Sequence, residues 1–404
     1  MKKPSAILFF LIIAGITIIA LLLRVWAVRK LPVDQDEGTY LLASSLYAQD
    51  IQQHNWPDIL KITYNNQHPS FAKFVYGLSL SEQKLIPIKR TMIKTLDILP
   101  KGTLKNMLMT IRYVSMVFGV LAVTILAVFN PMAGFFLAVQ SFAVKYTSVA
   151  YLEAIPAFTS LLTALAYLRW INLVGRQTKP MEFKHSFRVL IWVALTALFF
   201  GITVASKFAF GLIGIAIVVH FLWQTIHEHY PLGKAVLFLA TFGALSAIFF
   251  FISDIYLWAD PVNKLLAAVK FHLHYQDSRA IKSVYPMWQI FNWLSKSVLQ
   301  QDSVAIPHLG NDILLSLDLP IFILAIIGLP RLFKKNLFFF LWFIFTIAFL
   351  FIWQTKWTQY VMLVVTPLCL SSSEGFHFII LDPLIRLIDH FRLKTKNLEI
   401  PPLR

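Results

Sequence analysis

The chain is poor in cysteine and in charged residues. Its 404 residues include one cysteine, Cys369, and only 14% are charged, against about 25% in an ordinary soluble domain. A single cysteine excludes an internal disulfide framework and a metal site built on several cysteines. So few charges also exclude a water-soluble domain of this size, which has to cover its surface with polar groups.

Apolar residues take the place of the missing charges. They make up 58% of the chain, the mean hydropathy is +0.68, and long apolar runs recur along its whole length. Because one membrane span needs about 20 residues, about ten spans would use about half of the chain. The sequence therefore predicts an all-α polytopic membrane protein, folded as one integral membrane domain over residues 1–404.

Ten apolar runs are long or apolar enough to be predicted as spans. They lie at about 7–23, 107–129, 132–144, 155–168, 190–204, 208–223, 235–252, 313–329, 337–353 and 360–370. Most of the remaining residues fall into a first loop at 30–105, a second loop at 254–312 and a tail at 386–404. We expect both loops outside the cell and the tail in the cytoplasm.

The distribution of basic residues supports this orientation, because cytoplasmic segments of membrane proteins are enriched in Lys and Arg. The first run is longer than the core of a cleaved signal peptide, and no small-residue cleavage site follows it. Arg24, Trp26 and Arg29 follow instead, as an interfacial anchor would. Short segments predicted inside carry Arg169, Arg176, Lys179, Lys184, Arg188, Lys234, Arg331, Lys334 and Lys335, whereas the short outer turns carry one lysine each, Lys145, Lys207 and Lys356.

The net charge of +16 is therefore interpreted as a sign of orientation and of contact with anionic membrane lipid. Nucleic acid is excluded as a partner, since basic residues interleaved with aromatic ones do not cluster outside the apolar runs. Within the loops, residues 37–49 and 262–275 are predicted as helices. The second is amphipathic and begins beside Trp258, so we expect it to lie in the headgroup plane.

Three carboxylates, Asp34, Asp36 and Glu37, stand where the chain leaves the first span. One interpretation is helix capping, in which acids at a helix start satisfy free N–H groups. The other is catalysis: one carboxylate accepts a proton from a hydroxyl, and a second orients the first or holds a metal. Tyr40 would share a helix face with Asp36, four residues before it.

Charged residues from distant parts of the chain are predicted at the same side of the membrane as Asp36. For any single one, snorkelling of a long side chain to the interface is sufficient. Together they favour a site for an anionic lipid headgroup; the set is Arg112, Lys145, Glu153, Lys207 and Lys356.

Histidines contribute weaker signals. His68 and Lys73 flank the start of a predicted helix, where the proline after His68 has a structural explanation. His272 and His274 are two residues apart, but no third ligand is near in sequence. We therefore favour interfacial histidines over a metal site.

The order of these motifs resembles the protein O-mannosyltransferase and aminoarabinose transferase branch of the glycosyltransferase C superfamily. The resemblance spans nearly the whole chain. It rests on Asp-Glu-x2-Tyr from Asp36, His-Pro-x3-Lys from His68, an Arg that opens the second span, Leu152-Glu153, Ser206-Lys207-Phe208 and Thr355-Lys356-Trp357-x-Gln359-Tyr360. These superfamily members are membrane enzymes that use polyprenyl-phosphate-linked sugars.

The resemblance implies roles for individual residues. Asp36 matches the catalytic aspartate, Glu37 its partner, and His68 and Lys73 the family's His-Pro-Pro-x2-Lys segment. Ser70 stands where the family has its second proline, and Glu153 where it usually has Asp. The chain also has no large domain inserted in its second loop, unlike the eukaryotic protein mannosyltransferases.

The predicted function is transfer of a sugar, mannose or a similar hexose, from a polyprenyl-phosphate donor to an acceptor hydroxyl on a protein, lipid or glycan. Asp36 and Glu37 are the predicted catalytic pair, and Asp36 acts as the base. Arg112, Lys207 and Lys356 are predicted to bind the donor phosphate. Supporting residues are Tyr40, His68, Lys73, Glu153 and Tyr360.

No cofactor is required by this chemistry, while a divalent cation on Asp34 and Asp36 is left open. Two other classes of function also remain. A transporter or a flippase for lipid-linked sugars would place its polar groups near mid-membrane, and a non-catalytic assembly subunit would tolerate the loss of Asp36 and Glu37.

Overall fold

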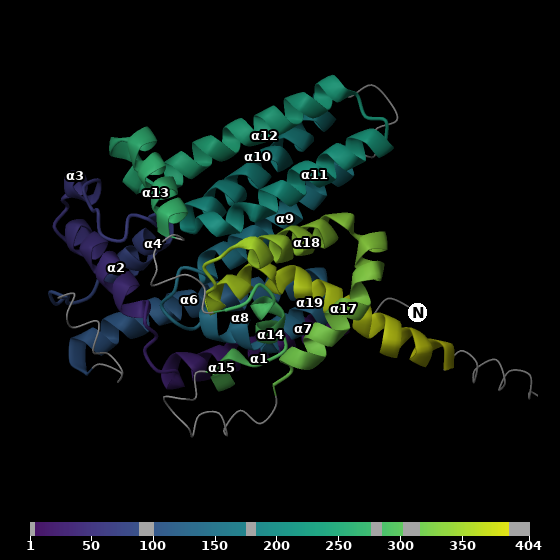
Figure 1. Ribbon diagram of the computed structural model, residues 1–404, viewed down its shortest axis with the longest axis horizontal. Helices are drawn as coiled ribbons and strands as arrows, with labels where there is room; N and C mark the ends of the chain where they lie inside the picture. The colour runs from purple at the N-terminus through teal and green to yellow at the C-terminus, as the bar shows by residue number, and fades with distance from the viewer. Residues whose placement is uncertain (1–4, 89–100, 175–182, 276–284, 302–315, 388–404) are drawn as a thin grey trace, which may run out of the picture.

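The computed structural model describes residues 5–88, 101–174, 183–275, 285–301 and 316–387. Within these ranges every regular element is a helix, which confirms the predicted all-α fold. The long helices run roughly side by side in one elongated bundle (Figure 1).

Seven helical segments in the described part of the chain are long and apolar enough to cross a membrane. They contain α1 (Ala6–Lys30), α6 (Gly102–Phe129), α9 (Ala154–Val174), α10 (Phe183–Ser206), α11 (Leu212–His227), α12 (Leu232–Ser253) and α19 (Met362–Phe376). Turn η1 (Phe208–Gly211) precedes α11, and α19 lies between η4 (Thr358–Val361) and η5 (His377–Leu381).

The other three predicted spans are not among these seven segments. The run at 132–144 is divided into α7 (Pro131–Val139) and α8 (Ser141–Tyr146), because Gln140 takes an extended backbone and its side chain caps α8 by accepting a hydrogen bond from the Ala143 N–H. The runs at 313–329 and 337–353 correspond to α17 (Asp318–Lys335) and α18 (Leu337–Ile352); residues 313–315 lie outside the described ranges. The prediction of one continuous span was therefore wrong for 132–144, whereas each of the other two runs contains a single helix, of 18 and 16 residues.

Arg24 stabilises the break between α7 and α8. Its guanidinium donates to the carbonyls of Leu137 (3.4 Å) and Ala138 (3.2 Å), and its Nε donates to Thr147 (2.8 Å). A cation at the last carbonyls of a helix is favourable. Gly119 of α6 makes room, since a Cβ there would lie 2.9 Å from Arg24 Nε. Arg24 is fully buried, so its prediction as an interfacial anchor was wrong.

Close packing holds the long helices of the bundle together. Helices α17 and α19 meet at two glycines, because a Cβ on Gly328 would lie 1.8 Å from the Ser371 carbonyl oxygen and one on Gly375 would lie 2.0 Å from that of Leu324. Elsewhere, the fully buried Trp170 of α9 packs its ring on Phe221 and Phe242.

The loop helices gather at one end of the bundle, on the left in Figure 1, which we call the loop end. They are α2 (Glu37–Gln52), α3 (Trp56–Ile59), α4 (Phe71–Leu80) and α13 (Pro261–Tyr275), with η2 (Ile255–Ala259) before α13. Both predicted loop helices are thus confirmed. Along α13, the apolar residues Val262, Leu266, Val269 and Leu273 form an exposed stripe, as an interfacial helix requires.

The two loops are bonded to each other. Asp254, at the start of the second loop, accepts hydrogen bonds from the backbone N–H (2.9 Å) and hydroxyl (2.5 Å) of Ser70 in the first. Lys264 donates to the Leu60 carbonyl (3.1 Å), and His272 Nε2 lies 2.9 Å from that of Gln67. His272 thus contacts backbone.

The N-terminus and the last described turns after α19 lie at the end of the bundle opposite the loop end (Figure 1). The two ends of the described chain therefore lie at the same end of the bundle. That this side is cytoplasmic stays a prediction, and residues 388–404 of the predicted tail lie outside the described ranges.

Candidate active site

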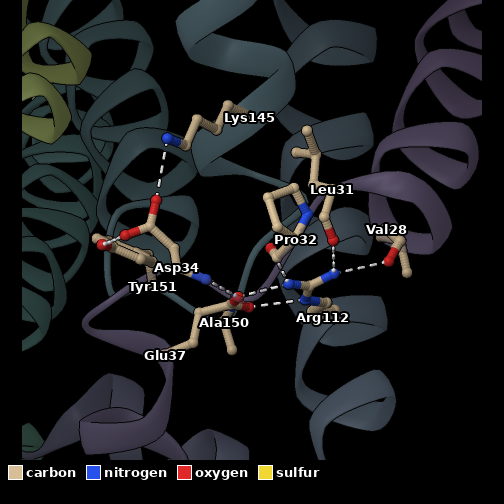
Figure 2. Close-up of polar contacts among 9 residues, drawn as sticks. All are labelled: Val28, Leu31, Pro32, Asp34, Glu37, Arg112, Lys145, Ala150 and Tyr151. Carbon is tan, nitrogen blue, oxygen red and sulfur yellow. Dashed lines mark hydrogen bonds and ion pairs between the residues drawn. The ribbon is translucent and has the colours of Figure 1, made fainter. Parts of the chain in front are cut away.

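The carboxylate of Glu37, at the loop end, is fully hydrogen bonded (Figure 2). It accepts hydrogen bonds from Arg112 Nε (2.7 Å) and Nη2 (2.5 Å), and from the backbone N–H groups of Ala150 (2.6 Å) and Asp34 (2.9 Å). Both charged side chains are fully buried. The contacts give Glu37 a structural role, because it joins α2, α6 and the turn before α9, and they leave neither oxygen free for chemistry.

Arg112 has no N–H group left for a donor phosphate. A guanidinium carries five N–H donors. Two go to Glu37, and the others go to the carbonyls of Val28 (2.9 Å), in the last turn of α1, and of Leu31 (3.0 Å) and Pro32 (2.8 Å), just after it (Figure 2). The geometry therefore does not support the predicted phosphate contact of Arg112; the residue anchors the end of α1.

Asp34 is the second carboxylate that is paired with a basic side chain. Lys145 Nζ lies 2.9 Å from Asp34 Oδ2, and the Tyr151 hydroxyl donates to Oδ1 (Figure 2). Burial acts to raise the pKa of Asp34, but Lys145 and Tyr151 outweigh it and hold the pKa below its usual value. Among the described residues, no group of three His, Cys, Asp or Glu side chains is placed to hold a metal ion.

Glu153 and Lys207 form a third pair. The Lys207 ammonium donates to Glu153 Oε1, and both side chains are buried. Burial raises the pKa of Glu153, while Lys207 opposes the change. Lys207 Nζ also lies 5.3 Å from the ring centroid of Tyr360, so residues from the α9, η1 and η4 regions meet here.

Asp36 differs from these three carboxylates. It occupies the N-cap position of α2, yet its side chain makes no capping hydrogen bond, so the capping interpretation does not describe this side chain. Its one side-chain hydrogen bond in the described chain comes from Gln359 Nε2, at 3.5 Å. Burial, with help from Asp34, raises the pKa of Asp36, and Lys207 opposes the rise. Asp36 is partly exposed and without an ion pair.

Aromatic residues surround Asp36. The Tyr40 ring meets the rings of Tyr151 (5.7 Å between centroids) and His68 (6.2 Å), and His68 meets His272 (5.6 Å). Burial, followed by Lys207, lowers the pKa of His68 well below its usual value, so this imidazole is neutral at pH 7. The charge of Asp36 also acts on Tyr40, Glu153 and Tyr360, and His68 joins this group through the Tyr40 ring.

The ammonium groups of Lys73 and Lys356 bind backbone carbonyl groups. Lys73 Nζ donates to the carbonyls of Asn65 (2.6 Å) and His68 (2.8 Å) and so shapes the turn that carries His68. Lys356 Nζ donates to three carbonyls at the end of α18, those of Leu350 (2.9 Å), Phe351 (3.3 Å) and Trp353 (2.7 Å). An ammonium has three N–H donors, so the geometry does not support the predicted phosphate contact of Lys356.

Sequence reasoning missed three residues of this site. Tyr151 and Asp254 bind Asp34 and Ser70, and Gln359 contacts Asp36. In the sequence Tyr151 stands two residues before Glu153, and Gln359 stands directly before Tyr360. These positions were the signals that could have pointed to both residues.

Neither a family model nor a curated protein sequence matches this chain. Solved structures do. ArnT from Cupriavidus metallidurans bound to undecaprenyl phosphate matches with a TM-score of 0.53 over 93% of this chain and 60% of that one, at 14% identity. The oligosaccharyltransferase of Archaeoglobus fulgidus in its apo form matches with a TM-score of 0.55 over 100% of this chain and 54% of that one, at 13% identity.

The chain has the glycosyltransferase C fold. The fold implied by the order of the motifs is thereby confirmed. The chain spans only 54–60% of the length of these two structures.

Proposed function

We propose that this protein is a membrane glycosyltransferase that moves a sugar from a polyprenyl-phosphate donor to an acceptor hydroxyl, with Asp36 as the base. One observation carries the proposal. Of the four carboxylates gathered at the loop end, Asp34, Glu37 and Glu153 each have a cation, whereas Asp36 forms no ion pair with any residue that the structure describes. The shared fold includes an enzyme solved with undecaprenyl phosphate, which supports a lipid-linked donor.

The reaction follows from this arrangement. Asp36 accepts the proton of the acceptor hydroxyl, whose oxygen forms a bond to the anomeric carbon. The bond from that carbon to the phosphate oxygen breaks, and the lipid phosphate leaves with the electron pair. A single displacement inverts the anomeric carbon through an oxocarbenium-like transition state. A raised pKa strengthens Asp36 as a base.

Lys207 is our candidate for the donor phosphate. Of the three cations predicted for this role, it is the one near Asp36, and its described hydrogen bond to Glu153 uses one of its three N–H groups. The leaving phosphate needs charge stabilisation, which a positioned ammonium supplies. The donor needs no general acid, because a phosphate is already a good leaving group.

Our proposal keeps the predicted hexose and an acceptor hydroxyl of a protein, lipid or glycan, with the loop end outside the cell. No cofactor enters the reaction. A divalent cation on Asp34 and Asp36 would have to displace Lys145 from Asp34. A transporter would instead need polar groups at mid-membrane, and the buried Arg24 within α1 is occupied by helix carbonyls.

The test uses purified protein in proteoliposomes with a panel of radiolabelled polyprenyl-phosphate sugars and candidate acceptors. We expect transfer, or slow release of free sugar, with at least one donor. Asp36→Asn should lower the rate by at least about 100-fold without loss of folded protein. Asp50→Asn, a partly exposed aspartate on the same helix α2, is the matched control and should transfer normally.

Lys207→Met should lower kcat and raise the KM for the donor more than that for the acceptor. Normal transfer by Asp36→Asn would remove Asp36 from the base role. An effect of Lys207→Met confined to the acceptor would exclude Lys207 from the phosphate contact. Movement of intact donor across the membrane, undiminished by Asp36→Asn and without any transfer, would favour a flippase.

A further inference from the structure

The segment between α18 and α19 is fixed from two sides. Lys356 binds the three carbonyls at the end of α18. Two residues later, the Thr358 hydroxyl is hydrogen bonded to that of Tyr146 in α8. Gln359 follows in η4 and is only 9% exposed. Its side chain therefore starts from a rigid position.

Gln359 and Asp36 lie 323 residues apart in sequence, and the fold brings them together. The contact runs from the amide Nε2 of Gln359 to Oδ2 of Asp36, at 3.5 Å, which is long for a hydrogen bond. Catalytic hydrogen bonds are often long before substrate is bound and shorten in the complex. This bond engages one carboxylate oxygen and leaves Oδ1 for the acceptor.

The neutrality of the amide distinguishes Asp36 from its neighbours. Arg112, Lys145 and Lys207 hold the other three carboxylates. A cation fixes a carboxylate but also lowers its pKa and weakens it as a base. An amide donor orients the carboxylate without adding a charge. A neutral amide at position 359 is thus suited to orient a carboxylate that acts as a base.

We propose that Gln359 is the positioning residue of the Asp36 base, holding Oδ2 so that Oδ1 is presented to the acceptor hydroxyl. This inference rests on the proposed function. Gln359 acts through Asp36 and has no direct part in bond formation.

The test is the pH dependence of kcat/KM in the transfer assay, whose acid limb reports the base of the free enzyme. Asp36 and the groups that influence it set this limb; the other titratable groups facing the site are Asp34, Tyr40, His68, Tyr151, Glu153, Lys207, His272, Tyr275 and Tyr360. Because all of them stay in place, a change at Gln359 isolates its own effect.

Gln359→Glu keeps the shape of the side chain and adds a like charge, so we expect the acid limb to move up by at least about one pH unit. Gln359→Leu removes the donor and should lower kcat about tenfold, with the donor KM within about twofold of wild type. Gln289→Leu is the matched control. Gln289 is equally buried, on α14 (Gln289–Leu294) beside η4, and its loss should leave both readouts unchanged.

An acid limb of Gln359→Glu that coincides with wild type, or a wild-type kcat for Gln359→Leu, would overturn the inference. If Gln359→Glu does not fold, the kcat of Gln359→Leu decides, provided that its melting temperature stays near that of wild type; Gln359→Asn, which keeps a shorter amide, should then recover part of the rate. Absence of any sugar transfer by wild type would instead refute the proposed function. Sugar transfer that requires Asp36 but is unchanged when Gln359 is replaced would refute only this inference.

Discussion

Replacing Glu37 by glutamine separates a structural acid from a catalytic one. The carboxylate accepts four hydrogen bonds, at 2.5–2.9 Å, from Arg112, Ala150 and Asp34. In Glu37→Gln an NH2 group must face at least one of these donors, and the buried Arg112 loses its counter-charge. Removing one partner of a buried ion pair costs about 3–5 kcal/mol.

Such a loss should lower the melting temperature by about 5–10 °C. Asp36→Asn should change it far less, because Asp36 is partly exposed and makes one long hydrogen bond. The assay is thermal unfolding in detergent, followed by sugar transfer with protein of confirmed fold. A Glu37→Gln variant with the wild-type melting temperature and no transfer would refute the structural role and return Glu37 to catalysis.

Three further predictions concern the cap of α18, the base and the contact between α17 and α19. Lys356→Met should lower the melting temperature by a few degrees, because three carbonyls lose their donor, and should leave the KM for the donor unchanged; a large rise in that KM would restore the phosphate role. Since burial raises the pKa of Asp36 above 3.8 and only the ionised base works, kcat/KM should fall on acidification at a higher pH than an ordinary aspartate gives, and an acid limb at or below pH 3.8 would contradict this. Gly328→Ala should destabilise the protein by about 1–3 kcal/mol, because its Cβ would lie 1.8 Å from the Ser371 oxygen, whereas Gly243→Ala, with open space around it, should melt like wild type.

The fold was largely predictable because lipid imposes a strong constraint on sequence. Apolar runs marked the crossings, and the acidic start at Glu37 and the amphipathic run after Pro261 marked α2 and α13. The break at Gln140 was not predictable, since the two polar residues Gln140 and Ser141 stand within an otherwise apolar run and do not by themselves end a helix. It depends on Arg24, which comes from another helix more than 110 residues away.

The site was predictable in part. Asp36 stood out by its position, but its lack of an ion pair within the described part of the chain is a tertiary property. Arg112 was misjudged because its partners are mostly backbone carbonyls, which leave no mark on sequence. Lys356 had a local signal: a lysine shortly after a helix commonly binds the last carbonyls. Gln359 had only its place in the motif beside Tyr360, because an amide carries no charge pattern.

The break between α7 and α8 also constrains how the chain enters the bilayer. Pieces of nine and six residues are too short to partition into lipid separately, and carbonyls freed at the break have no water to bind in hydrocarbon. The guanidinium that satisfies them belongs to α1, and the space beside it belongs to Gly119 of α6. We therefore expect this segment to insert stably only after the first two crossings, α1 and α6, are in place.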